Sequence, residues 1–130
     1  MEEKGKKYFR THEDLAIYQL AFSAAMDIFE QSKKFPVEER YSLTDQIRRC
    51  SRSVCANMAE AWRKRRYRAA FVAKLSDCEA EAAEAQVWLK FAVKCQYMKI
   101  EKARELYGTY NQVLSGLVKI ITHPDNWLLT

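Results

Sequence analysis

The sequence predicts an all-α protein, an antiparallel four-helix bundle with up-down-up-down topology. Three observations support this fold class. Apolar residues recur every three or four positions in four successive segments, the 130 residues include only 3 Gly and 2 Pro, and only a few residues separate one apolar segment from the next. Short connections make consecutive helices antiparallel neighbours. The scarcity of turn-forming residues argues against a turn-rich β-sandwich.

A chain of this length has room for one domain, which we expect to span residues 1–130. Residues 1–10 are rich in charge and are expected to be mobile, and residues 122–130 form a C-terminal tail. The tail carries Trp127 followed by two leucines. It therefore either folds back onto the bundle or docks on a neighbouring subunit.

The first helix is expected over residues 15–34. An apolar row leads from Leu15 to Phe29 at steps of three and four, and a second apolar row runs beside it. Thr11 and Asp14 supply the hydroxyl and the acidic third position of a variant capping box, which predicts the start of the helix.

The second helix is expected over residues 38–64, a length of about 40 Å, and its apolar seam runs from Leu43 to Ala61. The third helix is expected to begin at Tyr67, with a seam that reaches Ala92. Its many alanines favour helix intrinsically and let a neighbouring backbone come close.

The fourth helix carries a seam from Ala103 to Ile120, and a His-Pro pair at 123–124 ends it. Gly108 and Gly116 lie inside this helix. Each costs about 1 kcal/mol relative to alanine, so these glycines mark tight packing or local flexibility.

Several helices carry apolar residues beyond a single stripe. On the third helix Val87, Trp88 and Phe91 lie away from the main seam. A monomeric bundle needs only about a 100° apolar stripe on each helix. The additional apolar surface indicates either self-association or a wide core built from large aromatic residues.

The sequence offers no enzymatic machinery. It has no nucleophile paired with a base, no glycine-rich phosphate loop and no histidine cluster, so we expect a protein without catalytic activity and without a cofactor. The cysteines form no CxxC pair, which argues against a zinc site. They are expected to be reduced fillers of the core: Cys50, Cys55, Cys78 and Cys95.

The N-terminus lacks the apolar run of a secretory signal, and no long uncharged apolar stretch follows. We therefore expect a cytoplasmic protein with no membrane partner.

The net charge of +5 is concentrated in one stretch. Between Arg40 and Arg68 there are nine cations and two anions, whereas residues 69–130 are neutral overall. At 100° per residue, several arginines share a sector of the second helix opposite its apolar seam, with small Ala56 and Ala59 between them. The basic residues at the end of the helix extend this ridge, whose candidate binding residues are Arg48, Arg49, Arg52, Arg63, Lys64, Arg65 and Arg66.

Arginine pairs bidentately with phosphate, so the ridge predicts binding to the phosphate backbone of RNA or DNA. Two alternatives remain open. Either the arginines lie on a solvated helix face paired with Asp45 and Glu60, or they form an ion-pair interface with the acidic residues of the third helix, within one subunit or between subunits. No residue is placed to read base edges, and exposed aromatic residues are not clearly interleaved with the arginines.

Three stretches carry a family resemblance: 13–19 (EDLAIYQ), 34–49 (KFPVEERYSLTDQIRR) and 53–60 (SVCANMAE). They resemble the bacterial four-helix-bundle proteins known as the 23S ribosomal RNA intervening-sequence protein family. The resemblance extends from Thr11 to about Ile121. It implies a homopentamer of bundles around a central channel, no known enzymatic activity and a role in binding nucleic acid.

Carried over by position, the matching polar residues are Gln46, Arg48, Arg49, Asn57 and Glu60. Asn57 and Glu60 flank the arginine ridge, where they either orient arginines, cap a subunit contact or act as structural hydrogen-bond partners. Cys55 and Ala61 stand where family members commonly have Pro and Gly. This difference implies a straighter end of the second helix.

The accessory proteins of diversity-generating retroelements are similar in architecture and partner a reverse transcriptase. Two functions follow from these observations. The first is an oligomeric module that binds nucleic acid through the arginine ridge. The second is a structural adaptor whose oligomeric surface recruits a protein partner, such as a reverse-transcriptase-like or ribosomal component, with the arginines used in subunit contacts.

Overall fold

The computed structural model describes residues 9–129, and within them it contains four long helices and no strand. This confirms the predicted all-α class. The helices are α1 (Ala16–Ser32), α2 (Leu43–Arg63), α3 (Arg68–Lys94) and α4 (Ile100–Thr122), and three 3-10 turns accompany them: η1 (His12–Asp14), η2 (Val37–Glu39) and η3 (Pro124–Asn126).

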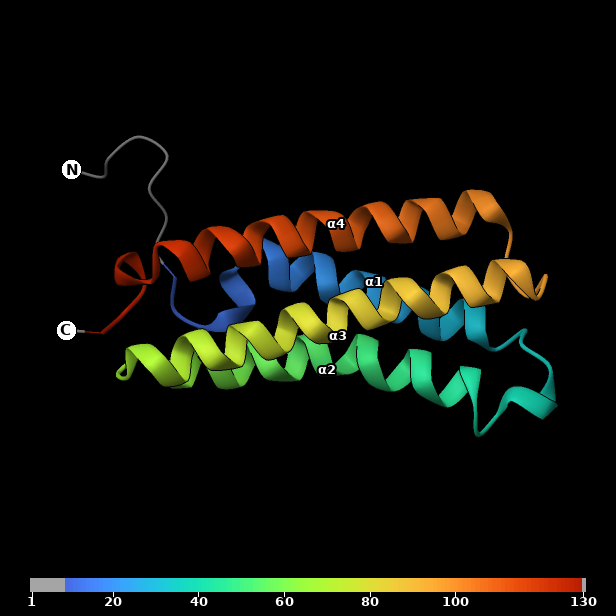
Figure 1. The fold of residues 1–130 in the computed structure, drawn as a ribbon, viewed down its shortest axis with the longest axis horizontal. Coiled ribbons are helices and arrows are strands. Elements are labelled where there is room, and N and C mark those ends of the chain that lie inside the picture. Colours follow the sequence, from blue (N-terminus) through green and yellow to red (C-terminus); the bar gives the residue numbers. More distant parts are fainter. Residues whose placement is uncertain (1–8, 130) are drawn as a thin grey trace.

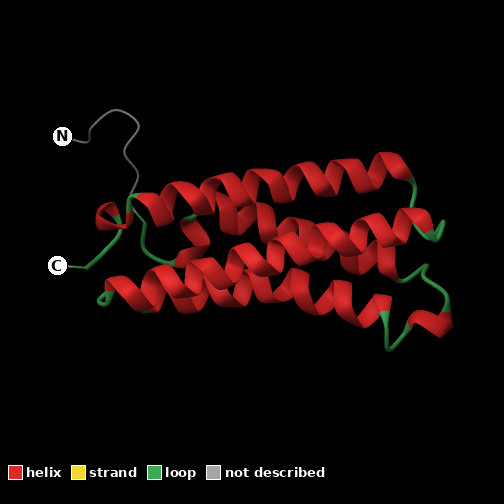
Figure 2. Cartoon of the chain, in the orientation of Figure 1, coloured by secondary structure: helices red, strands yellow, loops and turns green. Residues whose placement is uncertain are grey.

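The four helices lie side by side along one axis and alternate in direction (Figures 1 and 2). Each helix contacts the next one in the chain, and α1 also contacts α4, which closes the bundle. The start of α1 and the turn η3 lie at the same end, so both ends of the described chain meet there (Figure 1).

That end shows how the C-terminal tail is placed. The ring of Trp127 lies 5.0 Å from the ring of Phe9 and 6.3 Å from that of Trp62, measured between centroids. The tail therefore folds back onto its own bundle. Most of the segment expected to be mobile, residues 1–10, lies outside the described residues, but Phe9 packs in this aromatic cluster and the Arg10 amide donates to the Asp14 carboxylate at 2.6 Å.

The capping box forms as predicted, but it caps a different element. The Thr11 hydroxyl accepts from the Glu13 amide at 3.1 Å, and the Asp14 carboxylate accepts from the Thr11 amide at 3.1 Å. These bonds close the 3-10 turn η1. Leu15 is then extended, with ψ of 128°, so α1 begins only at Ala16.

α2 begins at Leu43, five residues later than expected. The cause is Glu39, whose carboxylate accepts from the Ser42 hydroxyl at 2.6 Å and from the Leu43 amide at 3.1 Å. This carboxylate caps the first turn from outside the helix, and these hydrogen bonds lower the Glu39 pKa. The helix has 21 residues and a length of about 31 Å.

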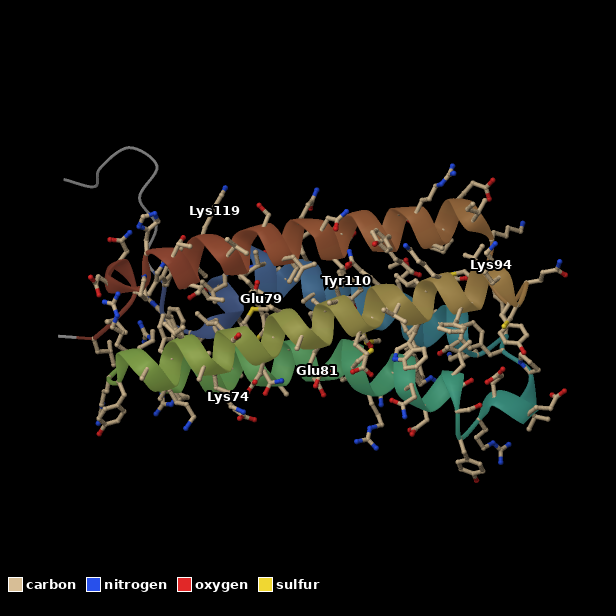
Figure 3. All side chains as sticks on the ribbon, in the orientation of Figure 1. Lys74, Glu79, Glu81, Lys94, Tyr110 and Lys119 are labelled. Carbon is tan, nitrogen blue, oxygen red and sulfur yellow. The ribbon has the colours of Figure 1, made fainter. Side chains whose placement is uncertain are left out.

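The core is built from the inner faces of all four helices. α3 contributes small side chains, among which Ala82 and Ala85 are fully buried, and α4 contributes the large ring of Tyr110. Tyr110 points from α4 into the bundle (Figure 3). Its hydroxyl has no hydrogen-bond partner among residues 9–129, and burial raises its pKa far above the ordinary value.

The two glycines of α4 lie in opposite environments. A Cβ at Gly116 would lie 2.3 Å from Cγ2 of Ile17 on α1, whereas a Cβ at Gly108 would meet nothing within 4 Å. Gly116→Ala is expected to lower the free energy of unfolding by about 1–3 kcal/mol, because α1 must shift. Gly108→Ala is expected to raise it by about 0.5–1 kcal/mol through helix propensity. Urea denaturation measures both, and a stable Gly116→Ala variant would contradict this account of the α1–α4 contact.

Three of the four cysteines fill the core as predicted, but Cys95 is exposed at the end of α3. Burial raises the pKa of Cys50 and Cys78 to about 12 and that of Cys55 to about 11. These three thiols therefore remain protonated at neutral pH and are shielded from reagents.

The native chain is expected to react rapidly with an aromatic disulfide reagent at one thiol, Cys95, at about pH 8. All four thiols should react after denaturation. Cys95→Ser removes the fast reaction, and rapid modification of a second thiol in that variant would show that the core is open.

No helix among residues 9–129 is both long enough and apolar enough to span a membrane. In the same part of the chain, no group of three or more His, Cys, Asp or Glu side chains is arranged to hold a metal ion.

Candidate nucleic-acid interface

The outward face of α2 carries a row of exposed cations. Arg49, Arg52 and Arg63 are solvent-exposed, and the small side chains of Ala56 and Ala59 lie between them along the helix. Lys64 and Arg66, exposed in the turn after α2, continue the row. Five of the seven basic residues predicted to bind nucleic acid therefore lie at the surface. We call the exposed set, Arg49, Arg52, Arg63, Lys64 and Arg66, the cationic face.

Arg48 departs from the prediction because it is half-buried against α1. Its Nε donates to the Ser32 hydroxyl at 2.7 Å, and its guanidinium lies 4.9 Å from the centroid of the Phe29 ring. Ser32 is itself 2% exposed. Arg48 therefore joins α2 to α1, a position that a helical wheel of α2 alone does not show.

Phe29 is surrounded by cations. Besides Arg48, Arg52 lies 5.7 Å and Lys33 4.8 Å from the ring centroid. Cations within about 6 Å of an aromatic centroid are attracted by its quadrupole. The ring thus holds positive charge at the boundary between α1 and α2, and sequence reasoning missed this contact.

The apolar row of α1 that leads through Phe29 lies largely outside the core, and the second row faces inward. The second row supplies the buried residues Ala21, Ala24 and Ile28, whereas Phe22 is 50% exposed and Tyr18 is half-buried. The ring centroids of Tyr18 and Phe22 are 6.1 Å apart. Aromatic side chains therefore do accompany the cations of α2, contrary to the expectation from the sequence.

Arg65, which the sequence predicts as a binding residue, makes contacts within its own chain. Its Nε donates to the Trp62 carbonyl at 2.8 Å, and its guanidinium lies 3.6 Å from the centroid of the Trp62 ring. In the C-terminal tail, the Trp127 carbonyl accepts from Nη1 of the guanidinium at 3.4 Å, and the Arg65 carbonyl accepts from the Leu129 amide at 3.0 Å. Partial burial, with the nearby charge of Arg63, lowers the pKa of Arg65. Arg65 thus anchors the C-terminal tail.

Arg65→Ala is expected to lower the free energy of unfolding by about 1–2 kcal/mol, because the stacking on Trp62 and the hydrogen bonds that the guanidinium donates are lost together. Arg66→Ala is the matched control. That residue is an exposed neighbour without a partner among residues 9–129, so its effect should stay within about 0.5 kcal/mol. Urea denaturation followed by tryptophan fluorescence compares the two variants, and equal stabilities would contradict the anchoring role.

Asn57 and Glu60 bind a lysine of α3 and no arginine. Lys74 Nζ lies 3.2 Å from Asn57 Oδ1 and 2.9 Å from Glu60 Oε1. The hydrogen bond from Lys74 lowers the Glu60 pKa. Among the readings of these two residues, the structural hydrogen-bond role is therefore the one observed. Gln46 lies apart from them, on a groove between α2 and α3 that Trp88 and Phe91 also line.

The acidic residues of α3 do not neutralise the cationic face. Lys74 and Glu81 both project from α3 on the side of α2 (Figure 3). Burial and the neighbouring Glu84 and Asp77 raise the Glu81 pKa, and Arg49 opposes this shift only in part. No arginine of α2 forms an ion pair with any residue between 9 and 129. Neither Asp45 nor Glu60 pairs with the arginines as the solvated-face alternative expected.

Residues 13–119 match the family model described as 23S rRNA-intervening sequence protein. The chain belongs to this family. Cys55 and Ala61 are buried within α2, which runs without interruption from Leu43 to Arg63.

A solved structure of similar fold is a protein of unknown function from the S23 ribosomal protein family of Bacteroides thetaiotaomicron. It has 25% sequence identity and a TM-score of 0.73, with 82% of this chain and 98% of that chain covered. No curated protein shows significant similarity to this member of the 23S rRNA-intervening sequence protein family.

Proposed function

We propose that the protein binds nucleic acid, through the phosphate backbone, on the cationic face of α2. It acts by binding and not by catalysis. The observation that carries this proposal is the unneutralised charge, because the five cations of this face form no ion pair with residues 9–129, whereas Lys74, Lys102 and Arg68 elsewhere in the bundle do.

The geometry of the face suits phosphates better than base edges. Arg52 and Arg63 are separated by eleven positions on one helix, a spacing of about 16 Å along its axis. Arginine forks at the surface can take phosphate oxygens in two parallel hydrogen bonds. Phosphate contacts carry affinity and orientation without sequence information, so we expect binding of low sequence specificity.

We further propose that the protein assembles as a homopentamer, the state that the family resemblance implies. Support comes from α3, where Val87 is 48% and Phe91 52% exposed, with Trp88 half-buried beside them. The groove between α2 and α3 that Trp88 and Phe91 line is also lined by Tyr41 and Leu43. Contiguous exposed apolar side chains of this size are typical of a protein–protein contact.

Purification of the protein from the cells that produce it tests the nucleic-acid proposal. We expect co-purifying nucleic acid, seen as a raised ratio of absorbance at 260 to 280 nm that falls after a high-salt wash. Separate digestions with ribonuclease and deoxyribonuclease identify the nucleic acid. A low absorbance ratio at low salt, together with no binding of added RNA or DNA, would contradict the proposal.

A further inference from the structure

We propose that the nucleic acid bound on the cationic face is single-stranded, with its bases stacked on the aromatic residues of α1. This inference rests on the proposed function and adds the strandedness of the ligand. The aromatic row of α1 consists of Tyr18, Phe22 and Phe29.

The row and the cations form one continuous surface. Arg48 and Arg52 of α2 both reach across to the ring of Phe29 on α1, so this end of the aromatic row touches the cationic face. Phe22 lies seven positions before Phe29, about 10 Å along the same helix. Because α1 and α2 are antiparallel, Phe22 is level with the small residues Ala56 and Ala59, between the two basic ends of α2.

The three rings of the row differ in how much of their surface is free to stack with a base. Phe29 is already contacted by Lys33, Arg48 and Arg52, and Tyr18 packs edge-to-face on His12 at 4.7 Å. Phe22 is the exposed member of the row, with half of its surface open to solvent. A base stacking on the row would therefore meet Phe22 first.

The arrangement of charged and apolar side chains on this surface favours a single strand over a duplex. Positive charge lies at both ends of this surface, at Arg52 and at Arg63. Its middle carries the Phe22 ring and the small side chains of Ala56 and Ala59. A duplex turns its phosphates outward and keeps base faces inside the stack, so an apolar middle contributes nothing to its binding. A single strand places phosphates at the ends and turns unstacked bases to the aromatic ring, and such stacking is tolerant of sequence.

Three proteins distinguish stacking from simple apolar contact: the native chain, Phe22→Leu and Phe22→Tyr. Leucine keeps apolar bulk without a π face, and tyrosine keeps the π face. Each is titrated by fluorescence anisotropy with a labelled oligouridine of about 15 nucleotides and with a hairpin duplex RNA carrying the same number of phosphates, at one low salt concentration.

We expect the native chain to bind the oligouridine more tightly than the duplex. Phe22→Leu should weaken oligouridine binding about tenfold and leave duplex binding unchanged, and Phe22→Tyr should bind like the native chain. Light scattering after gel filtration shows whether each variant keeps the native mass.

Several results would overturn the inference. If Phe22→Leu binds the oligouridine as well as the native chain does, or weakens both ligands equally, stacking is absent. If it changes the mass of the particle, the row is a contact between copies of the chain. In these cases duplex or single-strand binding by the native chain still upholds the proposed function. If the native chain binds neither the oligouridine nor the duplex, both this inference and the proposed function are contradicted.

Discussion

The double variant Arg49→Glu/Arg52→Glu is expected to bind RNA on the order of 100-fold more weakly than the native chain, because two phosphate contacts are lost and two repulsive charges replace them. Both side chains are exposed and form no ion pair among residues 9–129, so the thermal stability should change little beyond the loss of the contact between Arg52 and the Phe29 ring. Fluorescence anisotropy measures affinity, and circular dichroism confirms the fold.

A matched control shows whether RNA binding depends on the position of the changed charges or only on the net charge. Arg104→Glu/Lys119→Glu changes the net charge by the same amount on α4, where both side chains are exposed. If the phosphates bind on the face of α2, this control should bind RNA within a few-fold of the native chain. Equal losses for the two double variants would mean that net charge alone attracts RNA, and the cationic face would then not be the site.

Val87→Glu/Phe91→Glu is expected to convert the assembled protein into monomers of 15.3 kDa. The two side chains lie one turn apart on α3 and are each about half exposed, so a packed contact would bury them against a second copy. Two carboxylates in a buried contact lose their hydration without gaining partners, which costs on the order of several kcal/mol per charge and favours dissociation. Light scattering after gel filtration gives the mass directly.

Val118→Glu is the control for this second variant. Val118 is 46% exposed on α4, so the substitution introduces a carboxylate at a site of similar exposure outside the proposed contact. The control should keep the mass of the native assembly. A monomeric native protein, or an unchanged mass for Val87→Glu/Phe91→Glu, would contradict assembly through the α3 face.

Periodicity of three and four residues was sufficient to find all four helices, because each one buries a single stripe. The fully buried residues Ile47, Val54, Leu75 and Leu117 all fall on the seams read from the sequence. The ends were less predictable. The start of α2 depends on Glu39 folding back over Leu43, and a carboxylate that caps from outside the helix leaves no periodic signal.

The exposure of a basic side chain was predicted correctly where it depends only on the side chain's own helix. Arg49, Arg52 and Arg63 are exposed because they oppose the seam of α2. Arg48 and Arg65 differ because their partners, Ser32 and Trp127, come from distant parts of the chain. The sequence left open which of the two apolar rows of α1 faces the core, since two adjacent apolar rows look alike until packing shows which one faces inward.

The dependence of RNA affinity on salt tests the central claim most directly, because it counts the phosphates that the protein neutralises. With the five cations of the cationic face engaged by a single strand, log K should fall with log salt with a slope of about −3.5 between about 50 and 200 mM, and Arg49→Glu/Arg52→Glu should flatten it. A native affinity that does not change over this range, or a slope that the double variant leaves unaltered, would contradict binding of phosphates on this face.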